Sequence, residues 1–212
     1  MKDYPFELAK VLPVNQDTKV ERGRPITCRE WDSYPSIFLL STDPECWNNK
    51  SILDVGSGDK WDDPSRTFPG AKVCAIDPEF GEKGRIKWNT AHETVPGIVQ
   101  NIPYGDESFD HVVSSHAVTQ HVSPKDMSVG VLEMLRVAKV SGDVRLVPCI
   151  PKDLSGIDGM LMEAGFMIDL SQTGSDGPMA IINAGPDIQD PATKAVVLNK
   201  IRTSMGLAEK VS

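Results

Sequence analysis

The sequence predicts an α/β fold in which a doubly wound, mostly parallel sheet carries helices on both faces. Short apolar runs bounded by turn residues alternate with segments of helical periodicity, the pattern of repeated strand–helix–strand units. The first run, Ile52 to Val55, leads into Gly56 and Gly58, and a second, Lys72 to Ile76, ends in Asp77. Near-continuous apolar runs of this length are typical of parallel strands that are covered on both faces.

Composition narrows the class of protein. A chain of 212 residues suits one domain, or one domain with an appendage, and 40% apolar with 25% charged residues is ordinary for a soluble globular protein. The net charge of −8 disfavours a broad cationic surface for nucleic acid. Since no run of about 18 apolar residues occurs, we expect no membrane-spanning helix.

The cysteines indicate a compartment. Cys28, Cys46, Cys74 and Cys149 are scattered and form no C-x-x-C pair. We interpret them as reduced thiols, which excludes both a zinc site and a disulfide framework from the prediction. The expectation is a cytoplasmic protein that is not exported and that holds no metal.

The N-terminal quarter lacks a clear strand. Residues 1–28 predict an arm packed on a larger body, with a disordered leader as the alternative for the first residues. Residues 29–47 predict one or two short helices that are interrupted at Pro35. Two interpretations stay open for Trp31 and Tyr34: they cover the edge of the sheet, or they line the mouth of a cofactor or substrate site.

The first strand is followed by the most suggestive turn in the chain. Gly56 and Gly58 carry no Cβ, so the backbone there can turn sharply and approach a ligand closely. Asp54 stands at the carboxyl end of the strand, where open α/β sheets bind ligands. A strand followed by Gly-x-Gly is a weak signal by itself.

Asp77 strengthens that signal. It lies 23 positions after Asp54, close to the interval at which nucleotide-binding α/β units place a carboxylate on the ribose hydroxyls. A carboxylate suits this task because it accepts two donors at once. The alternative is an acidic turn residue before Pro78.

The middle of the chain predicts one strand, one helix and another strand. No confident element is predicted for 79–96, which we interpret as a loop on the substrate side. A strand follows over His111 to His116. Ser123 as N-cap and Pro124 at the first position predict a helix from Pro124 to Lys139. Ser141-Gly142 would end that helix before a strand over residues 143–147.

The C-terminal third predicts a short helix over 158–164 stopped by Gly165, a strand over 166–170 and a last strand over 179–183. The last strand can be antiparallel, as edge strands of mostly parallel sheets often are. An amphipathic helix follows over 192–207. We therefore divide the chain into an N-terminal arm with helices on the substrate side (1–50), a ligand-binding domain (51–184) and a helical extension (185–212).

Together, five segments resemble one family. Leu53 to Gly58 and Ala75 to Asp77 resemble the first two motifs of class I S-adenosylmethionine-dependent methyltransferases. The run Ile102 to His116, with its Pro103, Asp106, Ser108 and Asp110, resembles a segment of the subgroup that acts mostly on small molecules. Leu135 to Lys139 with Gly142, and Glu163 to Phe166, resemble two later motifs of that subgroup. The similarity covers 51–184, and the middle run is its most specific part.

The resemblance implies a seven-stranded Rossmann-like methyltransferase sheet, S-adenosylmethionine as cofactor and a role for particular residues. The glycine turn would pass close to the methionine part, and Asp54 would organise that turn or meet the amino group. Asp77 would hold the ribose hydroxyls, and the backbone of Val99 would lie near the adenine. The cofactor-binding residues implied in this way are Asp54, Gly56, Ser57, Gly58, Asp77, Pro78, Val99 and Ser115.

Three departures from the family pattern keep a second hypothesis open. Lys60 stands where a third glycine is common, and Ile98 stands where an acidic residue often binds the adenine amino group. The usual K-P-G-G turn is replaced by Lys139 to Gly142. The alternative is a catalytically silent, methyltransferase-like binding or assembly module. A nicotinamide-dependent oxidoreductase is disfavoured, because Trp61 replaces the last glycine of G-x-G-x-x-G.

The chemistry of methyl transfer points to two histidines. Transfer from a sulfonium is an in-line displacement that needs a positioned nucleophile, and a general base helps when the acceptor must lose a proton. His116 and His121 follow the fourth strand and are the candidates for that base, with a surface or capping histidine as the alternative. We expect a small-molecule acceptor methylated on oxygen or nitrogen. Carbon is less favoured, because no cysteine stands where a nucleophile for carbon methylation would be.

Overall fold

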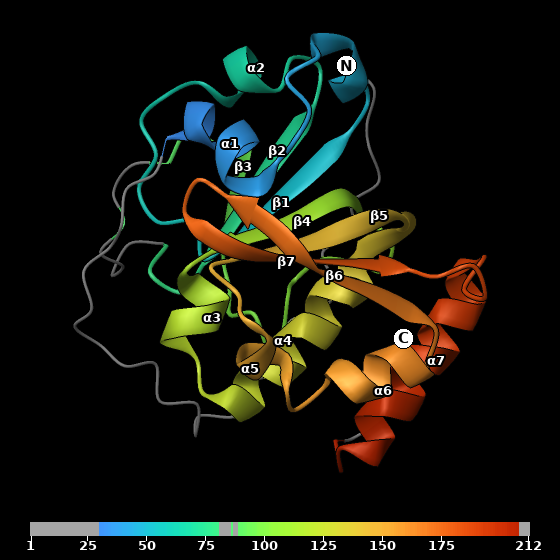
Figure 1. Cartoon of the computed structure of the whole chain (residues 1–212). Coiled ribbons are helices and arrows are strands. Elements are labelled where there is room, and N and C mark those ends of the chain that lie inside the picture. Colours follow the sequence, from blue (N-terminus) through green and yellow to red (C-terminus); the bar gives the residue numbers. More distant parts are fainter. Residues whose placement is uncertain (1–29, 81–85, 87–88, 208–212) are drawn as a thin grey trace.

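The computed structural model describes residues 30–80, 86 and 89–207, so the arm predicted for 1–28 lies outside the described residues. Seven strands form one sheet in the order β3-β2-β1-β4-β5-β7-β6 (Figure 1). Six of them run parallel, and β7 is antiparallel to both of its neighbours. This confirms the predicted doubly wound sheet and the antiparallel last strand. The expected edge position of that strand is wrong, because β7 lies between β5 and β6, and β6 forms the edge.

The elements follow the chain in this order. The strands are β1 Ser51–Val55, β2 Lys72–Asp77, β3 Glu93–Pro96, β4 Phe109–Ser115, β5 Ala138–Val147, β6 Phe166–Gly174 and β7 Gly177–Ala184. The short helices are η1 Trp31–Ser33, α1 Tyr34–Phe38, η2 Pro44–Trp47, α2 Pro64–Thr67, α3 Ala117–His121, α5 Pro151–Leu154 and α6 Asp158–Glu163. The two longer helices are α4 Pro124–Val137 and α7 Pro191–Ser204.

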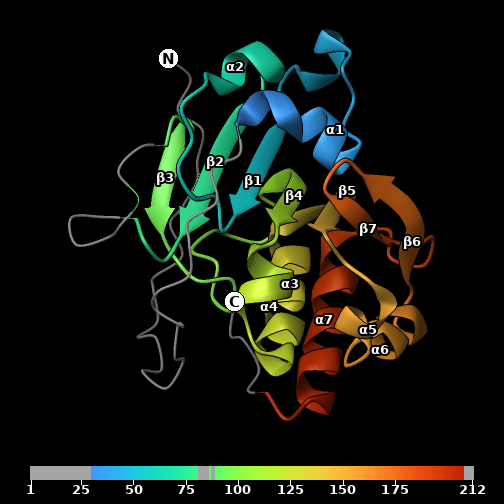
Figure 2. The same ribbon diagram turned by 60° about the vertical axis from the view of Figure 1, so that its left-hand side comes forward.

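The sheet separates two apolar cores, one on each face. Successive side chains of a strand point to opposite faces, so Leu53 and Val55 of β1 join the core under α4 and α7, while Ile52 joins the other. The second core is built by η1, α1 and η2 with aromatic side chains such as Phe38 and Trp47. Figure 2 shows the two helical layers on either side of the strands.

Strand β3 lies where the sequence predicts a loop, because Glu93–Pro96 is short and its apolar residues are sparse. It pairs in parallel with β2, from Cys74↔Glu93 to Asp77↔Pro96, and its side chains alternate between half-buried and exposed. A polar strand is stable here because it lies at the sheet edge. Lys72 Nζ also donates to Glu93 at 2.7 Å across the pair.

The junction of α4 and β5 differs from the prediction. The helix ends at Val137 and the strand begins at once, so residues 139–142 form an irregularity within the β4–β5 pairing instead of a turn before the strand. Phe109 pairs with Ala138, whereas His111 already pairs with Asp143. Glycine is required at Gly142, since a Cβ there would lie 2.5 Å from the carbonyl oxygen of Asp110.

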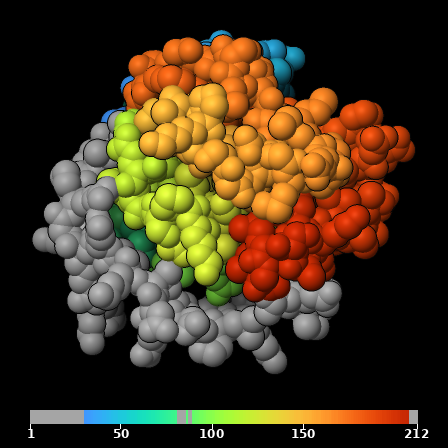
Figure 3. Space-filling model, turned by 60° about the horizontal axis from the view of Figure 1, so that its bottom comes forward, coloured from blue at the N-terminus to red at the C-terminus, as the bar shows by residue number. Residues whose placement is uncertain are grey.

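The C-terminal helix is packed against the sheet domain. Lys194 of α7 is buried and donates to Glu107 at 2.6 Å and to the carbonyl oxygen of Ala138. Arg202 donates to the buried carboxylate of Glu133 on α4 at 3.2 Å. Figure 3 shows the yellow-green surface of α3 and α4 beside the gold surface of α5 and α6 and the red surface of α7.

Asp110 joins the start of β1 to β4 and β5. Its carboxylate accepts from the N–H and Oγ of Ser51, both at 2.9 Å, and from Lys139 Nζ at 2.8 Å. Burial raises the pKa of this carboxyl, but the hydrogen bonds and the charge of Lys139 outweigh burial and hold the pKa at about 2.

We expect Asp110→Asn to lower the free energy of unfolding at pH 7 by about 2 kcal/mol, because a carboxyl with a depressed pKa stabilises the fold in its ionised form. That stabilisation is present above the unfolded-state pKa of about 4 and is lost as the pH falls towards 2. Urea denaturation should therefore show a steeper loss in wild type than in the variant between pH 4 and pH 2. The exposed Asp187→Asn is the control, and equal slopes in all three proteins would contradict the role of Asp110.

Candidate active site

Parallel pairing brings the carboxyl ends of β1, β2 and β4 to one edge of the sheet. Val55 of β1 is level with Ile76 of β2, and Asp54 is level with Val113 of β4. The glycine turn, Asp77, and Ser115 with His116 therefore leave the sheet on the same side. These are the residues to which the sequence analysis assigned the site.

The glycine turn adopts the backbone conformation that favours glycine. Gly56 has φ 75° and Gly58 has φ 66°. The N–H of Gly56 donates to the carbonyl oxygen of Ile76 at 2.8 Å, and the N–H of Gly58 donates to Asp77 Oδ2 at 3.2 Å. A Cβ on Gly56 would lie 2.0 Å from the Cβ of Ala117, so the turn also leaves room for the start of α3.

Asp77 retains capacity to accept further hydrogen bonds. Its two oxygens accept from Gly58 N and, at 2.9 Å, from Glu79 N, whereas a carboxylate has about four acceptor positions. Burial raises the pKa of Asp77, the two backbone hydrogen bonds oppose that rise, and the charge of Asp54 adds to it. Pro78 beside it is exposed.

A buried charged cluster lies beneath the glycine turn. Asp54 and Lys60 are each 1% exposed, and Lys60 Nζ lies 3.8 Å from Asp54 Oδ2. The same carboxylate oxygen accepts from the hydroxyl of Tyr34 at 2.6 Å. Lys60 Nζ donates to the carbonyl oxygen of Ser57 at 2.5 Å and lies 5.3 Å from the ring centroids of Trp31 and Tyr34. Lys60, which the sequence marks as a departure, is thus part of the support of the turn.

Trp31 and Tyr34 are expected either to cover the edge of the sheet or to line the mouth of a site, and their contacts in this cluster bear on both interpretations. Both side chains are buried in the core on the α1 face, at 0% and 1% exposure, which fits a covering role. Tyr34 nevertheless reaches the site through Asp54. Trp31 Nε1 donates to Thr90 Oγ1 at 3.0 Å, so η1 is tied to the segment that precedes β3.

Asn89 is a residue of the site that sequence reasoning missed. Its Nδ2 donates to Ser57 Oγ at 2.9 Å and to the carbonyl oxygen of Gly58 at 2.8 Å. Its Oδ1 accepts from the N–H of Ala91 at 3.0 Å. Asn89 lies in the segment without periodicity, so no local pattern could have indicated that it clamps the glycine turn.

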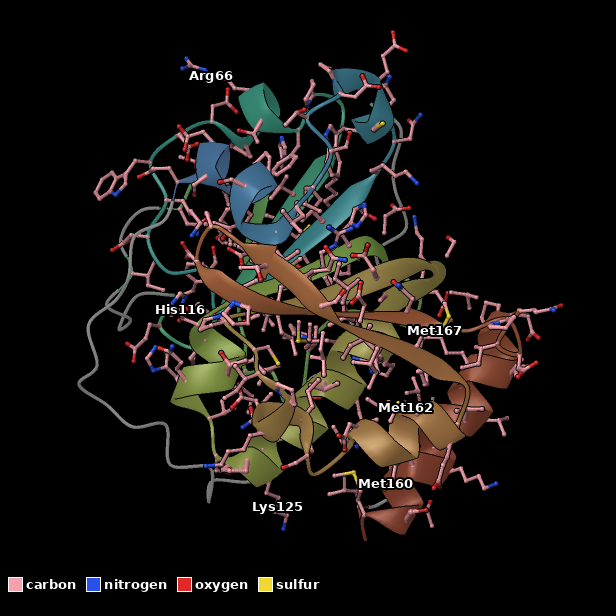
Figure 4. The ribbon with its side chains drawn as sticks, in the orientation of Figure 1. Arg66, His116, Lys125, Met160, Met162 and Met167 are labelled. Carbon is pink, nitrogen blue, oxygen red and sulfur yellow. The ribbon has the colours of Figure 1, made fainter. Side chains whose placement is uncertain are left out.

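The other predicted site residues differ in how close they lie to this edge of the sheet and in how exposed they are. His116 is the N-cap of α3, and its Nδ1 lies 3.0 Å from Ser115 Oγ (Figure 4). His121 ends the same short helix and is exposed. Val99 is buried against α4, where a Cβ on Gly130 would lie 2.8 Å from its Cγ2. The roles proposed for these residues, and for the glycine turn, Asp54, Asp77 and Pro78, remain predictions.

Gly56→Ala should lower the free energy of unfolding by more than the cost of a positive φ for alanine, because the added Cβ would also clash with the Cβ of Ala117. Gly206→Ala is the matched control: its φ is 70° and no heavy atom lies within 4 Å of a Cβ there. We expect the control to cost about 1 kcal/mol and Gly56→Ala clearly more, measured by urea denaturation. Ala117→Gly should recover part of the difference, and equal losses at both glycines would refute the contact.

Lys60→Met should destabilise the fold by about 3–5 kcal/mol, because it leaves the buried Asp54 without its cation. Adding Asp54→Asn should restore part of that loss, which a double-mutant cycle in urea would measure as a coupling energy. Lys125→Met, on the exposed surface at the start of α4 (Figure 4), is the control and should change little. Additive losses at Asp54 and Lys60 would exclude their interaction.

A comparison with protein-family models supports the geometric assignment. Residues 53–146, which span β1 to β5, match the family described as a methyltransferase domain. Residues 53–146 of this chain therefore form a methyltransferase domain. S-Adenosylmethionine is therefore its cofactor, and the recognition made on the sequence motifs is confirmed.

Three solved structures illustrate what this chain is similar to, and the first of them supports the shared fold. A chain in the complex between the Haloferax volcanii Trm112 methyltransferase activator and the putative methyltransferase matches with TM-score 0.51 and 14% identity, over 74% of this chain and 89% of that chain. A putative S-adenosylmethionine-dependent methyltransferase from Methanococcus maripaludis matches with TM-score 0.46 and 18% identity, over 73% and 83%. The Burkholderia thailandensis 1,6-didemethyltoxoflavin-N1-methyltransferase matches with TM-score 0.45 and 14% identity, over 65% and 71%. A search of curated proteins found no match.

Residues 30–80, 86 and 89–207 contain no helix with the length and apolar character needed to cross a membrane. Within the same part of the chain, no group of three or more histidine, cysteine, aspartate or glutamate side chains could hold a metal ion.

Proposed function

We propose that this methyltransferase transfers the methyl group of S-adenosylmethionine to an oxygen or nitrogen atom of a small-molecule acceptor. The observation that carries the proposal is the convergence of the glycine turn, Asp77 and His116 at one edge of the sheet. Ligands of open α/β sheets bind at this edge, outside the carboxyl ends of the strands. A cytoplasmic location remains an expectation from the sequence.

The residues at this edge fit the cofactor. Asp77 offers acceptor positions for two ribose hydroxyls, which are donors. Gly56 and Gly58 bring backbone without side chains to the end of β1, where the methionine part would lie. Asp54 and Lys60 hold opposite charges directly below that turn. The positions that the family pattern assigns to the ribose and to the methionine part therefore carry groups whose chemistry suits them, which supports the proposal.

The chain's contribution to catalysis would be positioning and proton removal. The bound cofactor supplies an electrophilic methyl group on a sulfonium. The protein must hold the acceptor atom in line with that methyl group, which replaces a bimolecular encounter by a fixed geometry. His116, at the mouth between β4 and α3, would accept the proton of an acceptor hydroxyl or amine. His121 on the same helix is the second candidate.

The alternative, a catalytically silent module, rests on Lys60, Ile98 and the altered turn from Lys139 to Gly142, together with the unusual segment 79–96. The position of Lys60 removes one of these arguments, because its buried ammonium supports the turn and does not block it through an exposed side chain. The second argument remains, because Ile98 offers no carboxylate to the adenine amino group and no other residue has been assigned to that contact. Absence of any cofactor binding would favour it.

Calorimetric titration with S-adenosylmethionine and S-adenosylhomocysteine tests the cofactor site. We expect Asp77→Asn to weaken S-adenosylhomocysteine binding at least tenfold, which is about 1.4 kcal/mol, because an amide oxygen accepts less strongly than a carboxylate. The exposed Glu163→Gln on α6 is the control for loss of one charge and should bind as wild type does. Wild-type protein that binds neither compound at millimolar concentration would overturn the proposal.

The raised pKa of Asp77 adds a pH dependence. Ribose hydroxyls favour the ionised carboxylate, so binding should weaken as the pH falls into the range where Asp77 takes up a proton. We expect the dissociation constant for S-adenosylhomocysteine to rise as the pH is lowered from neutral into the acid range in wild type, and to change less in Asp77→Asn. Parallel pH curves for the two proteins would show that Asp77 does not hold the ribose.

A further inference from the structure

Three polar side chains meet where β4 ends, and one of them comes from a distant hairpin. Ser115 Oγ lies 3.0 Å from His116 Nδ1 and, at the outer limit of a hydrogen bond, 3.5 Å from Asp176 Oδ2. The same oxygen of Asp176 lies 3.9 Å from His116 Nδ1. Asp176 belongs to the two-residue turn between β6 and β7, 60 positions after His116.

The position of Asp176 is fixed by the docking of its turn on α1. The N–H of Ser175 donates to the carbonyl oxygen of Ser36 at 3.0 Å. A Cβ on Gly174 would lie 1.8 Å from the carbonyl oxygen of Ile37, so the hairpin approaches the helix as closely as glycine permits. The tip of the β6–β7 hairpin lies just below α1 in Figure 1, and Figure 4 shows His116 on the same side of the view.

His116 itself is held in a rare backbone conformation. Its φ is 64° and its ψ is −31°, a region that residues with a side chain rarely adopt. Its N–H donates to the carbonyl oxygen of Val147 at the end of β5 at 2.6 Å, and its carbonyl oxygen accepts from Gln120 N at 2.9 Å. Strain held by the surrounding structure is typical of residues that a site needs in one orientation.

The order of donors and acceptors assigns the imidazole protons. A carboxylate accepts and cannot donate, so the hydroxyl proton of Ser115 points to Asp176. Ser115 Oγ can then accept from His116, which requires a proton on Nδ1. A neutral imidazole with its proton on Nδ1 carries its basic lone pair on Nε2.

We propose that Asp176, acting through Ser115, is a positioning residue that holds His116 in the Nδ1–H tautomer and makes Nε2 the proton acceptor. The inference rests on the proposed function and extends it by naming the atom that takes the proton. As the acceptor's oxygen or nitrogen forms its bond to the methyl carbon, the bond from that carbon to sulfur breaks and sulfur keeps the electron pair. The acceptor's proton passes to Nε2 and leaves an imidazolium.

The tautomer can be measured without knowing the acceptor. Long-range ¹H–¹⁵N spectra of the full chain, labelled in its histidines, distinguish Nδ1–H from Nε2–H, and His116→Gln assigns the signal among the four histidines. We expect His116 to be in the Nδ1–H form in wild type. Asp176→Ala and Ser115→Ala should each shift it several-fold towards the Nε2–H form that an unrestrained imidazole prefers. Asp169→Ala, an acidic residue of β6 bonded to Ser171, is the control and should leave the spectrum unchanged.

Each outcome decides between the two proposals. A wild-type Nε2–H tautomer, or an Asp176→Ala spectrum identical to wild type, overturns the positioning role even when S-adenosylhomocysteine binds. A tautomer that depends on Asp176 in a protein that binds no S-adenosylhomocysteine supports the positioning role and overturns the proposed function. Thermal denaturation of each variant verifies that the hairpin variants are folded before spectra are compared.

Discussion

The buried pair of Lys60 and Asp54 is the interaction on which the geometry of the site depends. A charge inside a protein costs several kcal/mol unless other groups surround it. Here the surroundings come from three places: the carboxylate of β1, the carbonyl oxygen of Ser57 in the turn, and the rings of Trp31 and Tyr34. The strand, the glycine turn and the helices before β1 must therefore be in place together. The shape of the turn is a property of the folded protein and not of its two glycines alone.

Helix α1 links this pair to the other half of the site. Tyr34 at its start binds Asp54, while the carbonyl oxygens of Ser36 and Ile37 receive the hairpin that carries Asp176. Arg145 of β5 caps the C-terminal end of α1, because its Nη1 donates to the carbonyl oxygen of Phe38 at 2.6 Å. A helix of five residues is marginal in isolation, so these contacts hold it. Helix α1 therefore contacts both the support of the glycine turn and the hairpin beside His116, and so links the positions of the two.

The motif that made the family recognisable has a structural explanation in α4. Arg136 donates to the carbonyl oxygens of Ile102 and Tyr104 at 2.9 and 2.8 Å and to Asp106 at 2.8 Å. Glu133, fully buried, binds Arg136 at 3.0 Å. The conspicuous middle run and the Leu-Arg-Val segment are thus two sides of one hydrogen-bonded unit that supports the loop before β4. These residues organise the scaffold.

The sequence by itself determined the sheet class, most of its strands and the residues at the strand ends, because apolar runs, glycines and acidic residues act locally. Gly56, Gly58, Asp77 and His116 were predicted in this way and lie on one edge. Only the tertiary structure decided that Asn89 clamps the turn, that Lys60 is buried, and that Asp176 faces His116. The contacts of Asn89 with the turn, of Lys60 with Trp31 and Tyr34, and of Asp176 with His116 join segments tens of residues apart. No local periodicity records a pairing that arises when separate elements pack on the two faces of a sheet.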